Sequence, residues 1–143
     1  MMVENKEKNL KNKMFLETLS PFDFPSTVDK LSKEIENKSW KISNVYDLQK
    51  TLNQHGKDVL PVKVFSLCHP NHSSRILEKD SERIISSMMP CRVSIYEKAD
   101  GKTYISRMNS SMIASGFGGI AEQVMTESAN EVEEIIEHIL QED

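Results

Sequence analysis

Cysteine and histidine side chains gather in one short stretch of the chain, Cys68-His69-Pro70-Asn71-His72. A second cysteine, Cys91, directly follows Met88-Met89-Pro90. Thiolate, imidazole and thioether groups are ligands that zinc and copper(I) accept in proteins. If the two segments lie side by side, Cys68, His72 and Cys91 would form a soft-metal site with methionines beside it.

This metal site has a competing interpretation, because the chain contains no Cys-x-x-Cys pair and no His-x-x-x-His pair of the kind found in many zinc sites. Cys68 and Cys91 also fit the description of small buried apolar residues. His69 and His72 would then be polar groups at the surface.

The same two cysteines could instead carry out thiol redox chemistry. A thiolate is favoured near a helix N-terminus or a cation. Cys68 precedes a predicted helix, and Arg92 follows Cys91. A reversible disulfide between them requires Cα atoms within about 7 Å of each other.

A third possibility is a pocket for a small molecule or anion at the helix that begins near Asn71. Free N–H groups at a helix N-terminus can bind an anion, and Arg75 would add a positive charge. Ordinary capping by Asn71 is the alternative. We reject a phosphate loop at Gly118-Gly119, because the pair follows a helix and lacks the Gly-Lys-Ser/Thr ending. A helix bend or close packing explains these glycines better.

The elements that must position these residues form a pattern of short strands and helices. Strands are expected at residues 14–19, 40–45, 62–68, 91–96 and 102–108. Helices are expected from Pro25, with Ser26 as the cap, at 48–55, after Pro70 and at the C-terminus.

The clearest local turn signal is Asp100-Gly101, which predicts a hairpin between the last two strands. A two-residue turn there would place Ile95 opposite Ser106. It would also place Val93 opposite Met108.

The C-terminal helix has one continuous apolar face, made of Val132, Ile135, Ile136, Ile139 and Leu140. We expect the glutamates at 131, 133, 134 and 137 to form a solvated face rather than a cation site. Together the elements predict an α+β domain with a mainly antiparallel sheet and helices on one face. A second copy of the protein is the simplest cover for the other face.

The bulk composition excludes some classes of protein. The chain has 143 residues and a formal net charge of −4, which gives no electrostatic footprint for nucleic acid. No apolar run approaches the roughly 20 residues of a membrane span. We expect a disordered tail at residues 1–13, one domain at 14–143, and a cytoplasmic protein with reduced thiols.

The order of short motifs resembles a known family. These motifs are Val62-Lys63-Val64-Phe65 leading into Cys68-His69-Pro70, then Met89-Pro90-Cys91-Arg92-Val93, then Asp100-Gly101-Lys102. The chain is similar here to the bacterial and archaeal domain of unknown function number 302. The resemblance implies a TATA-binding-protein-like sheet topology and pairing into dimers, but no agreed activity. His69 departs from the family, which usually has Asn there, while Cys68 and Cys91 match it.

We therefore expect a dimeric protein that binds a small ligand or a soft metal. The ligand-binding residues would be Cys68, Cys91, Asn71 and Arg75, and the metal ligands Cys68, His72 and Cys91. One alternative is a structural or partner-binding dimer without chemistry, and another is a thiol redox protein. The chain has no Gly-x-Ser-x-Gly elbow, and its sequence identifies neither a catalytic residue nor a cofactor.

Overall fold

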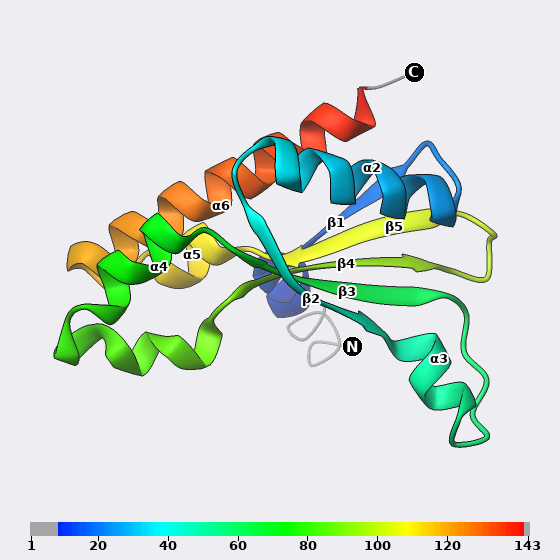
Figure 1. Ribbon diagram of the computed structural model, residues 1–143, viewed down its shortest axis with the longest axis horizontal. Helices are drawn as coiled ribbons and strands as arrows, with labels where there is room; N and C mark the ends of the chain where they lie inside the picture. The colour runs from blue at the N-terminus through cyan, green and yellow to red at the C-terminus, as the bar shows by residue number, and fades with distance from the viewer. Residues whose placement is uncertain (1–8, 142–143) are drawn as a thin grey trace.

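The computed structural model describes residues 9–141 (Figure 1). The predicted disordered tail at 1–13 falls mostly outside these residues. Residues 9–14 are helical, which differs from that prediction.

Five strands form one antiparallel sheet in the order β1-β5-β4-β3-β2. The strands are β1 (Phe15–Ser20), β2 (Lys41–Asp47), β3 (Val62–Cys68), β4 (Cys91–Glu97) and β5 (Thr103–Met108). The predicted bounds of β3 are confirmed, and every neighbouring pair is antiparallel. The expectation of a mainly antiparallel sheet is therefore confirmed.

Two long helices, α2 (Phe24–Asn37) and α6 (Gly119–Leu140), cover one face of the sheet (Figure 1). Their apolar stripes bury Leu31 and Ile35 from α2 and Ile135 from α6 against Phe65 and Leu67 of β3. Burying such side chains stabilises the fold by about 1.5–3 kcal/mol each. Phe65 and Leu67 thus belong to the core, and do not sit on the uncovered face.

The shorter helices lie near the two ends of the sheet (Figure 1). At one end are α4 (Pro70–Leu77), α5 (Ser110–Ala114) and the 3-10 helix η1 (Asp80–Met88). At the other end is α3 (Leu48–Asn53). The first group surrounds the places where β3 ends and β4 begins, so it brings the Cys68 and Cys91 segments into one region.

The cap of α2 differs from the prediction. Asp23 is the N-cap, and its Oδ1 accepts a hydrogen bond of 2.9 Å from the Ser26 N–H. The helix begins two residues before the predicted cap because Pro25 is well suited to the first turn of a helix. The expectation that Ser26 caps the helix was wrong.

The β4–β5 hairpin has a different register from the predicted one. Ile95 pairs with Ile105, and Val93 pairs with Arg107. The Gly101 N–H donates to the Lys98 carbonyl at 3.0 Å, and Gly101 has φ +77°. The turn is therefore a three-residue loop closed by a left-handed glycine. The extra loop residue, Ala99, moves the register by one.

Gly118 and Gly119 connect α5 to α6 with positive φ values of 68° and 59°. A Cβ at either position would meet no atom within 4 Å. Close packing does not explain these glycines, and neither does a bend within a helix. They are needed because an L side chain is strained at positive φ.

Candidate functional site

A cavity of about 250 Å³ lies at the end of the sheet where β3 ends and β4 begins. Its walls come from β1, β3, β4, β5, α4, α5, α6 and the end of η1. The apolar lining includes Leu67, Ile76, Val124, Val132 and four methionines, at positions 88, 89, 108 and 125. The polar lining includes Cys91, His69, His72, Arg92 and Arg107. Two of the sequence-predicted residues, His72 and Cys91, therefore face the same space.

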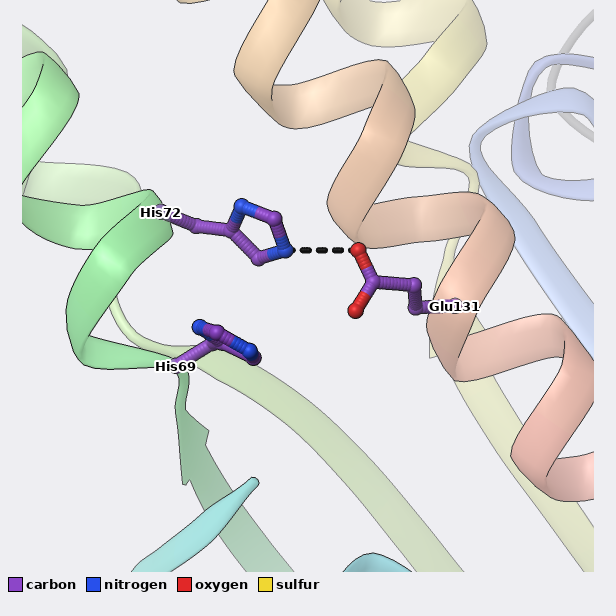
Figure 2. Close-up of side chains that lie close together, drawn as sticks. All are labelled: His69, His72 and Glu131. Carbon is purple, nitrogen blue, oxygen red and sulfur yellow. Dashed lines mark hydrogen bonds and ion pairs between the residues drawn. The ribbon is translucent and has the colours of Figure 1, made fainter. Parts of the chain in front are cut away.

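Two imidazole rings and a carboxylate meet at the edge of this cavity (Figure 2). The His72 Nε2 lies 2.6 Å from the Glu131 Oε2, and the rings of His69 and His72 are 4.2 Å apart. Trp40 donates from its Nε1 to the other Glu131 oxygen at 3.3 Å. Among residues 9–141, His69, His72 and Glu131 are the group of potential metal ligands whose ligand atoms all lie within 4.8 Å of one another.

The other ring nitrogen of each histidine is buried. Nδ1 of His69 and Nδ1 of His72 have no hydrogen-bond partner among the described residues. A buried polar atom without a partner costs about 1–3 kcal/mol. The hydrogen bond to Glu131 accounts for one nitrogen of His72, but no hydrogen bond within residues 9–141 accounts for the burial of the two Nδ1 atoms.

Two polar contacts join α4 to α6. The earlier residue of α4 contacts the later residue of α6, and the later residue of α4 contacts the earlier one. His72 contacts Glu131, and Arg75 donates to Glu127 at 2.6 Å. Residues three or four apart lie on the same side of a helix, so one side of α4 faces one side of α6. The Arg75 guanidinium lowers the pKa of Glu127 by hydrogen bonding, with a smaller effect from Gln123.

Arg107 forms a second polar cluster in the cavity wall. Its Nε lies 2.8 Å from Glu133 Oε2 and its Nη2 lies 2.5 Å from Glu133 Oε1. A further nitrogen donates to the Thr18 hydroxyl at 2.7 Å. The two-point contact neutralises the guanidinium charge inside the wall.

The two cysteines lie close in the sheet but have different surroundings. Cys91 pairs in register with Leu67, the neighbour of Cys68, and lines the cavity. Burial raises the pKa of the Cys91 thiol to about 11, and the Cys68 thiol adds to the effect. Cys68 packs its Sγ 3.4 Å from the Ser73 hydroxyl and does not line the cavity. Both are free thiols.

The remaining predicted residues lie outside the cavity lining. Asn71 is exposed in the first turn of α4, whose N-cap is His69 without a side-chain cap bond. The Arg75 guanidinium forms an ion pair with Glu127. At the anion site predicted from Asn71 and Arg75, the Arg75 guanidinium is therefore not free to bind an anion.

Sequence reasoning missed the carboxylates of the site. Glu131 and Glu133 were expected on a solvated face, yet both are half-buried and bonded to His72 and Arg107. Each lies directly beside Val132 of the apolar stripe, about 100° away on the helix. This position beside Val132 could have indicated partial burial, because residues next to the apolar stripe lie at the edge of the buried face of the helix.

Comparison with known proteins identifies the family. Residues 16–142 match the family described as Domain of unknown function DUF302. The chain therefore belongs to this family, as the motif order indicated. No curated protein matches the chain.

A solved structure supports the fold. It is the crystal structure of an uncharacterized conserved protein DUF302 from Bacillus stearothermophilus, with a TM-score of 0.78 and 13% sequence identity. The alignment covers 88% of this chain and 98% of that one. At this identity the likeness establishes the α+β fold alone. The more specific TATA-binding-protein-like topology stays a prediction.

No helix within residues 9–141 is long and apolar enough to cross a membrane.

Proposed function

We propose that this protein binds a small organic molecule with an apolar body and one carboxylate. The cavity at the end of the sheet is the observation that carries the proposal. Ligand sites are concave, mostly apolar, and carry a few polar groups that fix orientation. The cavity has this composition, with leucine, isoleucine, valine and methionine walls.

The size of the cavity supports a small ligand. Its volume is about 250 Å³, below the roughly 300–1,000 Å³ of most drug-sized sites. An apolar cavity of about 150 Å³ is large enough for benzene. A bicyclic aromatic or a medium-length aliphatic body therefore fits the space. The four methionines can adjust their shape to such a body.

The charged residues of the lining favour a ligand that carries a single anionic group. Arg107 is neutralised by Glu133. Arg92 also lines the cavity, and it is exposed and has no ion pair in the part of the chain that the structure describes. An arginine side chain pairs well with a carboxylate. Because Cys91 and Val93 face the cavity side of β4, the Arg92 side chain leaves the strand on the opposite face. It would therefore meet a ligand carboxylate at the mouth of the cavity, with the ligand body inside against Met125.

We also propose that two copies pair through the sheet face opposite α2 and α6. Phe15, Leu19 and Tyr46 are each more than 40% exposed. Phe15 and Leu19 lie on the face of β1 opposite to Thr18 and Ser20, which contact Arg107 and Thr27 on the helix side. Tyr46 pairs with Val64, the neighbour of the core residue Phe65. Large exposed apolar groups on one face favour an interface. Leu19→Lys should then convert a dimer to a monomer in analytical ultracentrifugation, and a monomeric wild type would refute the pairing.

The ligand proposal is tested by titrating the protein with 2-naphthoate, which has an apolar body and one carboxylate. Trp40 is the single tryptophan of the chain and lines the cavity, so its fluorescence reports occupancy. We expect saturable quenching with one molecule bound per chain. Naphthalene, without the carboxylate, should bind more weakly.

Two matched variants make this test specific. Ala129→Phe fills the cavity from α6 and should abolish binding. Asn130→Phe adds the same ring at the next residue, which is exposed and outside the lining, and should bind normally. Equal binding by both variants would refute the cavity as the ligand site. No binding by the wild type would instead favour a partner-binding dimer without chemistry.

A further inference from the structure

The histidine–carboxylate trio at the cavity edge has the composition of a metal site. His69 and His72 come from the start of α4, and Glu131 comes from the middle of α6 (Figure 2). One potential ligand atom from each lies within 4.8 Å of the others. Two imidazole nitrogens and one carboxylate oxygen are a ligand set that zinc uses, whereas copper(I) favours sulfur.

Three features of the surroundings point to a ligand at this position. Nδ1 of His69 is buried without a partner among residues 9–141, whereas the unpartnered Nδ1 of His72 faces away from Glu131 (Figure 2). The ring centroids of His69 and His72 lie 4.2 Å apart, with the ring planes tilted by 37°, so the two imidazoles are close enough to share one ion. Trp40 holds the Glu131 oxygen that does not contact His72, as an outer-shell hydrogen bond orients a metal ligand.

We propose that His69, His72 and Glu131 bind one divalent cation of the zinc class. This inference does not rest on the organic ligand proposed above. It uses His72 from the predicted metal set but replaces Cys68 and Cys91 with His69 and Glu131. Because the protein supplies three ligands, a fourth position stays open for water, as in zinc sites that are not purely structural.

Metal binding requires a small local change. Zinc–nitrogen and zinc–oxygen bonds of about 2.1 Å at a tetrahedral angle separate the two ligand atoms by about 3.4 Å. The His72 Nε2 and Glu131 Oε2 are 2.6 Å apart, so they must separate while His69 approaches. Rotation of the Glu131 side chain, which is 37% exposed, can provide this change.

The test uses the untagged full chain, because an added histidine tag would itself bind zinc. Isothermal titration with zinc chloride and native mass spectrometry should give one zinc per chain. His69→Asn, His72→Gln and Glu131→Gln should each weaken binding by at least about 100-fold, since even outer-shell changes cost about 10- to 100-fold. Circular dichroism confirms that each variant is folded.

Two control variants distinguish this site from other candidate metal sites. His138→Gln removes the other histidine–glutamate pair, which His138 makes with Glu34, and should leave zinc binding unchanged. The double variant Cys68→Ser with Cys91→Ser should also bind normally. In the wild type, cobalt(II) should show visible bands without a thiolate charge-transfer band.

Three outcomes would overturn the proposal. These are no saturable zinc binding, unchanged binding in the three site variants, or loss of binding in the cysteine double variant alone. The last outcome would assign the metal to the thiols. Zinc titrations contain no organic ligand, and 2-naphthoate titrations are repeated with a chelator, so each proposal fails on its own measurement.

Discussion

Arg107 of β5 and Glu133 of α6 form a two-point ion pair, with nitrogen–oxygen distances of 2.8 and 2.5 Å. This contact joins the sheet to its covering helix at the cavity wall. The Arg107 side chain is only 10% exposed, and that of Glu133 is 38% exposed. We predict that Arg107→Met destabilises the fold by about 1–3 kcal/mol, because Glu133 and Thr18 lose their partner. Urea unfolding measures the change.

The control for this prediction is a solvent-exposed ion pair on the protein surface. Lys33 and Asp29 lie 3.0 Å apart on α2, and both side chains are more than 60% exposed. Lys33→Met should cost at most about 0.5 kcal/mol. Similar losses in the two variants would show that burial does not distinguish the pairs.

A second prediction concerns acid stability. Hydrogen bonds from Lys98 and then from Tyr96 lower the pKa of Glu17 below its ordinary value of 4.5. A lowered folded-state pKa stabilises the protein above the ordinary value, and this contribution is lost as the pH falls through the folded-state pKa. Glu17→Gln should therefore be less stable at neutral pH and lose less stability on acidification.

The expected size of this effect is small. The Glu17 side chain is 41% exposed, so solvent screening limits its contribution to about 0.5 kcal/mol at neutral pH. Urea unfolding at a series of pH values measures it, with the exposed Glu36→Gln on α2 as the reference. An acid dependence identical to that of the wild type would contradict the assigned role of Glu17.

A third prediction concerns the reactivity of Cys91. Its pKa of about 11 means that the thiol is protonated at neutral pH, and the thiol form is a poor nucleophile. In a Cys68→Ser background, iodoacetamide should alkylate Cys91 slowly near neutral pH and faster as the pH approaches 11. The same chain unfolded in urea should react faster at neutral pH. Rapid reaction of the folded chain would instead favour the thiol redox alternative.

A fourth prediction compares two glycines. A Cβ at Gly101 or Gly116 would meet no atom within 4 Å, so steric contact is the same for both. Gly101 has φ +77°, whereas Gly116 does not lie in the left-handed region. Gly101→Ala should cost about 1–2 kcal/mol, and Gly116→Ala about zero or less. Thermal unfolding compares them, and equal effects would refute the role of positive φ.

The sequence predicts elements whose signals are local. The bounds of β3 at Val62–Cys68 follow from its β-branched and apolar residues, and the stripe of α6 follows from helical spacing. The hairpin register could not be derived, because loops of two and three residues both place a glycine at position 101. That difference of one residue decides whether Val93 faces Arg107 or Met108.

The site could be predicted only in part, because its members come from distant segments. The local stretch at His69 and His72 was recognisable by residue type alone. Its partner Glu131 lies 59 residues from His72 in sequence and stood among several other glutamates. Only the packing of α4 against α6 selects Glu131 from that group. Cys68 was expected to share the site with Cys91, yet it packs outside the cavity, against Ser73.

The most direct test of ligand binding in the cavity is NMR of the protein with labelled methionine methyl groups. Four methionines, at 88, 89, 108 and 125, line the cavity, whereas Met14 and Met112 do not. Titration with 2-naphthoate should shift the four cavity methyl signals in a saturable way and leave Met14 and Met112 unchanged. Shifts at Met112 or Met14 without shifts at the cavity methionines would contradict the account.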